Sequence, residues 1–246
     1  MRPSRAWFTA EQGTALCLGA VLAVLAHPNV AESLWRLLGS GSVEAFPVDR
    51  LMRLAASHAQ LAALAMVPAG VIGVGLGVIV TRPWGASLRP LIDHLAAAAQ
   101  AVPPVVVVAL AFPALGFGAA PTILALILYA LMPILRSTIG AVESTSPDVR
   151  AAARAMGLTS GQILKEVEWP LARPVILDGL RVALVLSVAT AAVGALAGAE
   201  TLGTPIIIGL QNQNELYLLQ GAAATAALAF FAEGALLVAA RSDGHR

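Results

Sequence analysis

The residue types that usually carry chemistry are present in this sequence, but not at the spacings that catalysis needs. A phosphate-binding loop requires a lysine followed by Ser or Thr after a glycine-rich turn, whereas the single lysine, Lys165, is followed by Glu166. Ser57-His58 and Thr190 lack the context of a nucleophile with its base, and the four histidines lack zinc-ligand spacing. The sequence therefore predicts no catalytic, cofactor or metal site, and any energy must come from a partner.

The most specific signals for local structure, namely helix caps and turn residues, lie in a polar segment, about residues 140–173, between two apolar stretches. Ser146-Pro147-Asp148 predicts a helix start, because a capping hydroxyl, a first-turn proline and an acid suit the positive end of a helix dipole. Gly157 predicts a left-handed stop to that helix. Thr159 with Gln162 predicts a capping box that begins a second short helix.

Pro170 is expected to end that second helix, residues 160–167, because the residue before a proline avoids helical angles. The segment is thus predicted to be an ordered elbow of two short helices. It is longer than a simple connection between two spans. These local sequence signals leave two interpretations open. The elbow either docks onto a partner or lies on the lipid headgroups.

The composition is that of a helical membrane protein. Of the 246 residues, 58% are hydrophobic and 12% are charged, with a mean hydropathy of +0.81, whereas soluble domains are about 45–50% apolar and about 25% charged. A soluble fold of this size could not bury so much apolar surface. The net charge of +1 provides no positive field for nucleic acid, which excludes a nucleic-acid binder.

Six stretches are long and apolar enough to cross about 30 Å of hydrocarbon as helices, which takes roughly 20 residues each. The third is interrupted by Pro103-Pro104, so we expect a kink or break whose freed carbonyls are satisfied by neighbours or a polar cavity. Glycines four apart, Gly73 with Gly77 and Gly194 with Gly198, predict close helix packing. The predicted spans are residues 6–26, 54–80, 88–115, 121–139, 175–199 and 215–240.

The positive charges predict the direction of these spans. Arg36, Arg50 and Arg53 fall on one side, and the other twelve of the 15 lysines and arginines fall on the opposite side. Because positive charge is retained in the cytoplasm, we expect both termini to be cytoplasmic. In an alternative interpretation, the N-terminal arginines and the sequence Val24-Leu25-Ala26 belong to a cleaved signal peptide, which would leave five spans.

Ionisable side chains inside the predicted spans are functional candidates, because they are costly in lipid. Asp93 lies four residues from Arg89, and Asp178 lies three residues from Arg181, which favours a structural ion pair for each. Glu233 lies deeper in the sixth span and has no cation nearby in the sequence. It is expected to meet another helix or a partner subunit, or to line a path.

The segment VRAAARAMGLTSGQILKEVEWPLARPVILDGLR, residues 149–181, resembles the EAA loop of ABC-importer permeases. It has the small-residue triplet, then Gly157, and then Pro170 thirteen residues on. Three further blocks are similar to osmoprotectant permeases of the glycine betaine/choline type, and they are VTRPWG (80–85), ALILYALMPILRSTIGAV (125–142) and TLGTPIIIGL (201–210). The resemblance covers about residues 54–240.

The resemblance implies an all-α, multi-pass permease of the type I ABC-importer fold in a bacterial cytoplasmic (inner) membrane. Its implied partners are separate ATPase subunits that hold ATP and Mg, a second permease that is identical or a sister chain, an extracytoplasmic substrate-binding protein and the lipid bilayer. Two departures stand out, because Ala151 replaces the usual glutamate and Trp169 replaces a leucine. The implied ATPase-docking residues are Met156, Gly157, Leu158, Thr159, Gln162, Ile163, Glu166 and Pro170.

A translocation path and gate are expected among a few polar or helix-breaking positions. The chain has few aromatic residues within its spans, so we expect substrate selection on a separate binding protein rather than in an aromatic cage here. The outer segment 200–214 is expected to act in delivery or gating, with a short re-entrant helix that starts at Thr204-Pro205. The expected path or gate residues are Pro103, Pro104, Tyr129, Pro133, Thr190, Glu200 and Thr204.

The expected organisation is an N-terminal helix with an extracytoplasmic segment (1–53), a permease domain (54–240) and a cytoplasmic tail (241–246). The expected function is a permease subunit for small osmoprotectants such as glycine betaine or choline. An ABC permease for another small solute, such as an amino acid, is the first alternative. An ion-coupled carrier is disfavoured by the absence of an inverted repeat, and an intramembrane protease by the absence of a nucleophile motif.

Overall fold

The computed structural model describes residues 5–38 and 44–242, and this part of the chain is helical without any β-strand. Residues 1–4 and 243–246, which belong to the predicted N-terminal segment and cytoplasmic tail, lie outside the described residues. Four of the described helices are long and apolar enough to cross a membrane, or up to six if each of two bent helix pairs is one span. This confirms the prediction of an all-α, multi-pass membrane protein, and the predicted six spans are the upper end of the four to six that these helices allow.

Two compact units divide the chain, and three long helices contribute residues to both. Unit 1 comprises residues 1–65, 103–126 and 184–246, and unit 2 comprises residues 66–102 and 127–183. The elements in chain order are α1 (Arg5–Ala26), α2 (Pro28–Leu38), α3 (Val48–Val80), η1 (Ala86–Leu88), α4 (Arg89–Ala101), α5 (Pro104–Leu115), α6 (Ala119–Glu143), α7 (Pro147–Ala155), α8 (Ser160–Gln162), η2 (Ile163–Glu168), α9 (Trp169–Ala191), η3 (Ala192–Ala197), α10 (Gly203–Gln211) and α11 (Glu215–Ser242).

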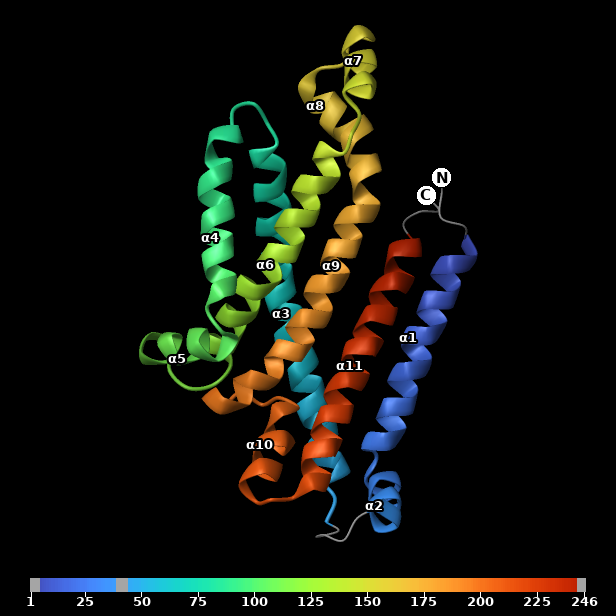
Figure 1. Cartoon of the computed structure of the whole chain (residues 1–246), viewed down its shortest axis with the longest axis vertical. Coiled ribbons are helices and arrows are strands. Elements are labelled where there is room, and N and C mark those ends of the chain that lie inside the picture. The colour runs from blue at the N-terminus through green and yellow to red at the C-terminus, as the bar shows by residue number, and fades with distance from the viewer. Residues whose placement is uncertain (1–4, 39–43, 243–246) are drawn as a thin grey trace. The chain divides into compact units, whose positions relative to one another are not determined.

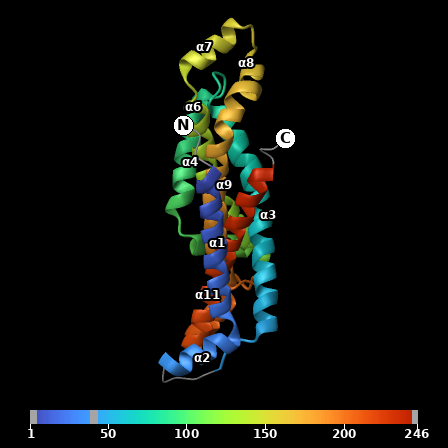
Figure 2. The ribbon, with the colours of Figure 1, turned by 90° about the vertical axis from the view of Figure 1, so that its right-hand side faces the viewer.

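In unit 1, the first and last long helices, α1 and α11, lie side by side (Figures 1 and 2). Small residues permit this approach, because a Cβ on Gly234 would lie 2.7 Å from Leu16 Cδ2. The chain turns by 73° between α1 and α2. Helix α10 packs against α11, so the predicted short helix after Thr204-Pro205 is present in the structure.

Unit 2 is built on close packing between α3 and α6. A Cβ on Gly73 would lie 2.8 Å from Ile134 Cγ2, and one on Gly77 would lie 2.6 Å from Thr138 Cβ. Both glycines therefore let the two helix backbones approach more closely than any other residue would allow. The packing role that the spacing of Gly73 and Gly77 predicts is confirmed.

The second predicted glycine pair does not form a packing face. Gly194 lies against Thr122, but Gly198 has a φ of 78° and ends η3 in the left-handed conformation. The helix that the sequence predicts through residue 199 changes at Ala191 into the short 3₁₀ segment η3. The prediction is wrong for Gly198, because spacing alone does not show whether a glycine continues a helix or stops it.

Replacing Gly73 by leucine is expected to lower the stability of the protein far more than the same change at Gly75. Overpacking of a filled contact costs about 1–3 kcal/mol, whereas a Cβ on Gly75, two residues along α3, would meet nothing within 4 Å. Thermal unfolding of both variants in the same lipid nanodisc measures the difference. Equal losses of Tm would contradict the assigned α3–α6 contact.

The break predicted at Pro103-Pro104 is present, because α4 ends at Ala101 and α5 begins at Pro104. Val102 is extended, with a ψ of 122°, so its carbonyl lies outside the hydrogen-bond pattern of the helix. The Tyr129 hydroxyl donates a hydrogen bond to this carbonyl, and the Gln100 side chain donates to the Tyr129 carbonyl at 3.4 Å. A neighbouring helix thus satisfies the freed carbonyl, as lipid burial requires.

The predicted helix end at Trp169-Pro170 is wrong, because the helix continues from α8 through η2 into α9. Trp169 has helical angles (φ −59°, ψ −48°), and its N–H donates to the Leu164 carbonyl, five residues back. The wider π-helical turn of η2 gives room for the proline ring, which would clash with the carbonyl four residues back in an ordinary α-helix. Pro170 therefore lies inside a continuous helix, at the start of its α9 segment.

Candidate coupling site

The predicted elbow is formed by α7 and α8. It lies at the end of unit 2 where α6 ends and α9 begins (Figure 1). Ser146 caps α7, since its side-chain oxygen accepts a hydrogen bond from the Asp148 N–H at 3.2 Å. Gly157 ends α7 with a φ of 86°, and the Leu158 N–H donates to the Ala153 carbonyl at 3.1 Å. The predicted start and left-handed stop of this helix are both confirmed.

The capping box that begins α8 is also confirmed. The Thr159 N–H donates to Gln162 Oε1 at 2.8 Å, and the Gln162 N–H donates to Thr159 Oγ1 at 3.4 Å. The turn between α7 and α8 is therefore defined by its own residues.

Most of the residues that the resemblance assigns to docking are open to solvent. Met156 is 72% exposed, Leu158 is half-buried, and Ile163 is only 4% exposed because it packs into unit 2. The contact of each residue with a partner stays a prediction. Ala151, at the position of the missing glutamate, is exposed as well. The remaining exposed docking candidates are Gly157, Thr159, Gln162, Glu166 and Pro170.

A buried carboxylate lies directly behind the elbow. Glu168, the last residue of η2, is 2% exposed and lies between two guanidinium groups. Arg150 of α7 donates from Nε to Glu168 Oε1 at 2.6 Å, and Arg82 Nη1 lies 2.8 Å from Glu168 Oε2. We call these three residues the Glu168 cluster. It joins the end of α3, the elbow helix α7 and the start of α9.

The two arginines are held in place by further contacts. Arg150 Nη2 donates to the Val142 carbonyl at 2.6 Å, near the end of α6. Arg82 donates from Nη2 to Thr81 Oγ1 at 3.1 Å. A buried charge is tolerated when it is paired and hydrogen-bonded in this way. The cluster thereby ties the elbow to three long helices of unit 2.

A second, exposed ion-pair group lies in the same unit. Arg89 pairs with Asp93 at 3.6 Å, as the four-residue spacing predicts, and it also contacts the Glu143 carboxylate at the end of α6. Exposed pairs of this kind contribute little to stability. The pairing of Asp178 with Arg181 and the partner of Glu233 stay predictions.

Sequence reasoning missed the Glu168 cluster. Arg82 lies in the block VTRPWG, and Arg150 directly precedes Ala151, the position of the missing glutamate. The structure shows that the Arg150 guanidinium is engaged inside the chain, whereas Arg154 is exposed. The available signal was an acid just before Trp169-Pro170, in a segment expected to meet a partner.

The expected path and gate residues lie in different places. Tyr129 bonds across the α4–α5 break, whereas Pro133 lies half-buried inside α6 and Thr190 half-buried near the end of α9. Glu200 and Thr204 share one cavity in unit 1. A role of these residues in transport stays a prediction. Within residues 5–38 and 44–242, no group of His, Cys, Asp or Glu side chains could hold a metal ion.

One histidine has a structural role that the sequence did not indicate. His58 is fully buried in unit 1, with Nε2 2.7 Å from the Val188 carbonyl. The Leu202 N–H donates to His58 Nδ1 at 3.1 Å. Because Nδ1 accepts from an amide, the ring is neutral and carries its proton on Nε2, which donates to the carbonyl. His58 thus fixes the residue before α10 against α3 and α9.

Comparisons with known proteins agree with this architecture. Residues 73–241 match the family model described as "Binding-protein-dependent transport system inner membrane component". The chain is 34% identical over 192 residues to the osmoprotectant import permease protein OsmY of Salmonella typhimurium, which covers 78% of this chain and 81% of that protein. It is 33% identical over 182 residues to the glycine betaine/carnitine/choline permease protein OpuCD of Bacillus subtilis, which covers 72% and 76%.

A solved structure shows a similar fold. A chain of the inward-facing MetNI methionine ABC transporter matches with a TM-score of 0.70 at 22% sequence identity. The match covers 79% of this chain and 96% of that chain. At this identity the likeness concerns the fold alone.

Proposed function

Because the chain belongs to the family of binding-protein-dependent transport system inner membrane components, we propose that it is the permease subunit of an ATP-driven importer of osmoprotectants such as glycine betaine or choline. The names of its relatives support this substrate class. The observation that carries the proposal is the exposed elbow of α7 and α8, which the Glu168 cluster braces against three membrane helices.

The proposed partners follow from the missing phosphate-binding loop and from the exposed elbow. Lys165 is its only lysine, and no phosphate-binding loop surrounds it, so ATP and Mg bind to separate ATPase subunits. The elbow docks on such a subunit through the exposed residues near Gly157. A second permease, identical or a sister chain, completes the path, and an extracytoplasmic binding protein delivers the substrate.

Transport in this proposal proceeds by alternating access. ATP binding draws the two ATPase subunits together and moves the docked elbows. The cluster passes this movement to α3, α6 and α9, because a buried ion pair with short contacts resists separation. The helices then change which side of the path is open, with Pro103, Pro104, Tyr129, Pro133 and Thr190 as candidate lining residues.

The proposed topology places both termini and the elbow in the cytoplasm. It assigns residues 1–53 to an N-terminal helix with its outer segment, 54–240 to the permease domain and 241–246 to a cytoplasmic tail. A single cysteine at Thr159, in a Cys17→Ser background, tests it in intact cells. We expect labelling only after the membrane is permeabilised. Labelling by an impermeant reagent from outside would overturn the topology.

Uptake in proteoliposomes tests the proposed function. The chain is co-purified with its ATPase and supplied with its binding protein, and uptake of radiolabelled glycine betaine, choline and methionine is measured with and without ATP. We expect ATP-dependent uptake of at least one of the first two compounds. ATP-dependent uptake of methionine alone would replace the substrate class, and ATP-independent uptake would exclude an ATP-driven importer.

A further inference from the structure

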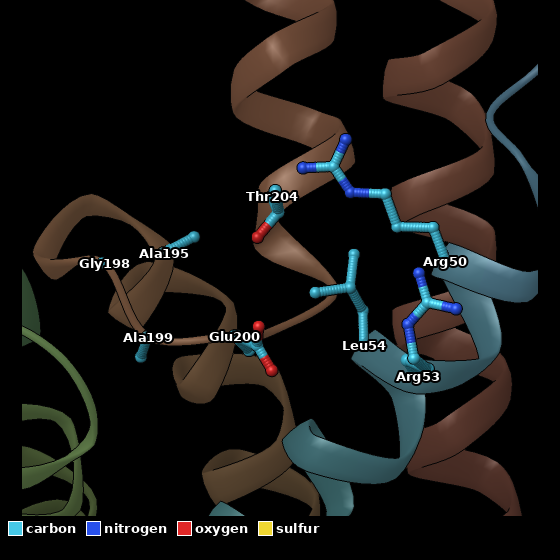
Figure 3. A pocket seen from close by; sticks show the side chains of 8 residues that line it. All are labelled: Arg50, Arg53, Leu54, Ala195, Gly198, Ala199, Glu200 and Thr204. Carbon is cyan, nitrogen blue, oxygen red and sulfur yellow. The ribbon is translucent and has the colours of Figure 1, made fainter.

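A cavity of about 280 Å³ opens in unit 1 between the first turns of α3 and the segment that joins η3 to α10 (Figure 3). Helix α3 supplies Arg50, Arg53 and Leu54 to its lining, and the joining segment with α10 supplies Glu200 and Thr204. The Arg50 side chain extends toward Thr204 in Figure 3. The cavity thus brings two positive groups, one negative group and a hydroxyl around one space.

The charged groups of this cavity are not paired with one another. The ion pairs in the described part of the chain involve other side chains, so neither guanidinium lies within 4.0 Å of the Glu200 carboxylate. Arg50 lies over the Phe46 ring, 5.3 Å from its centre, and forms no ion pair among the described residues. Opposite charges kept apart around a cavity suit a ligand that carries both charges.

The frame of the cavity is held firmly. Phe46 is buried, and its N–H donates to Gln220 Oε1 at 2.8 Å. His58 holds the Leu202 N–H, which fixes the segment just before Thr204. Gly198, with a φ of 78°, turns the chain so that Glu200 follows at the cavity wall. Buried contacts therefore hold the backbone segments from which Arg50, Arg53 and Glu200 extend their exposed side chains.

We propose that this cavity is a binding site for a small zwitterion. The carboxylate of the ligand pairs with the guanidinium groups of Arg50 and Arg53, which suit planar carboxylates. Its quaternary ammonium group faces the Glu200 carboxylate, and Leu54 contacts its methyl groups. This inference rests on the proposed function, and it assigns to the importer a site on the permease in addition to the site of the binding protein.

The site predicts different responses to two probes. Glycine betaine carries a carboxylate and a quaternary ammonium group, whereas choline carries only the ammonium group. Arg53→Gln is therefore expected to raise the dissociation constant for glycine betaine by about tenfold, the value of one charge-assisted hydrogen bond, and to leave that for choline unchanged. Glu200→Gln is expected to weaken the binding of both probes.

Saturation-transfer NMR on the assembled permease–ATPase complex in nanodiscs, without the binding protein, measures these constants at millimolar probe concentrations. Arg36→Gln is the matched control, because it removes an exposed arginine of α2 that does not line the cavity. Arg53→Lys should retain part of the affinity for glycine betaine, since it keeps the charge. Thermal unfolding of each variant verifies that it folds, and Glu200→Gln tests the site independently of Arg53.

Three results would overturn the zwitterion site. They are a wild-type complex that gives no saturable glycine betaine signal, variants that all behave like Arg36→Gln, and variants that lose affinity only for the binding protein. The last result would make the cavity a protein-docking surface. If the complex transports glycine betaine in proteoliposomes with its binding protein but shows no binding at this cavity in nanodiscs, the site fails and the proposed function stands. If it transports no osmoprotectant, the proposed function itself fails.

Discussion

Glu168→Gln is expected to destabilise the protein and to separate ATP hydrolysis from transport. The change leaves the partly buried Arg82 and Arg150, which are 15% and 24% exposed, without their shared carboxylate. Removing one partner of a buried pair costs roughly 3–5 kcal/mol, and the partial exposure of the arginines places the expected loss at about 3 kcal/mol. Chemical unfolding of the assembled complex measures this loss.

The transport readout separates a coupling role from a purely structural one. At a temperature where the Glu168→Gln complex remains folded, the ATP hydrolysed for each substrate molecule transported should rise several-fold. Glu143→Gln is the matched control, because this carboxylate is 45% exposed and pairs with Arg89 in the same unit. Its loss should change stability by less than about 1 kcal/mol. Normal coupling in a folded Glu168→Gln complex would exclude the cluster as the link between elbow and helices.

Gly157→Trp is expected to abolish the stimulation of ATP hydrolysis by the substrate-loaded binding protein. Gly157 has a φ of 86°, where a residue with a Cβ is strained by about 1–2 kcal/mol. It also lies exposed at the tip of the elbow, so a tryptophan would separate the docking surfaces. A loss of the central interface contacts lowers affinity by at least about tenfold. ATPase assays and co-purification of the ATPase with the permease measure both effects.

Alanine variants separate backbone strain from bulk. Gly157→Ala adds only a methyl group in the strained conformation, whereas Gly140→Ala adds the same group on α6 without positive φ and with nothing within 4 Å. We expect a reduced but measurable stimulation for Gly157→Ala and an unchanged value for Gly140→Ala. If Gly157→Trp left transport-coupled ATP hydrolysis intact in an assembled complex, the elbow would not be the coupling element.

Much of the local structure could be predicted because it depends on residues that are close in sequence. The caps at Ser146 and Thr159 and the left-handed stop at Gly157 each involve hydrogen bonds within a few residues. The spans followed from long apolar runs, and the break at Pro103-Pro104 followed from the missing N–H of proline. Local rules failed at Pro170, because Trp169 keeps helical angles before the proline and the helix continues through a π-helical turn.

The candidate sites depend on contacts that no local pattern contains. Arg82, Arg150 and Glu168 come from three separate elements, and the cavity of unit 1 joins α3 to a segment more than a hundred residues later. The partner of the Val102 carbonyl, Tyr129, likewise lies on another helix. Spacing along one helix predicts pairs such as Arg89 with Asp93, but not pairs between helices.

By itself, the sequence determined the class of the protein, its apolar spans, the elbow and the absence of a phosphate-binding loop, because these follow from hydropathy, capping and the order of residue types. Only the tertiary structure decided which charges meet. Helix packing placed Glu168 between two arginines and kept Glu200 apart from Arg50 and Arg53. The energy of a charge in a membrane protein depends on its neighbours in space, and the folded arrangement of the helices sets those neighbours.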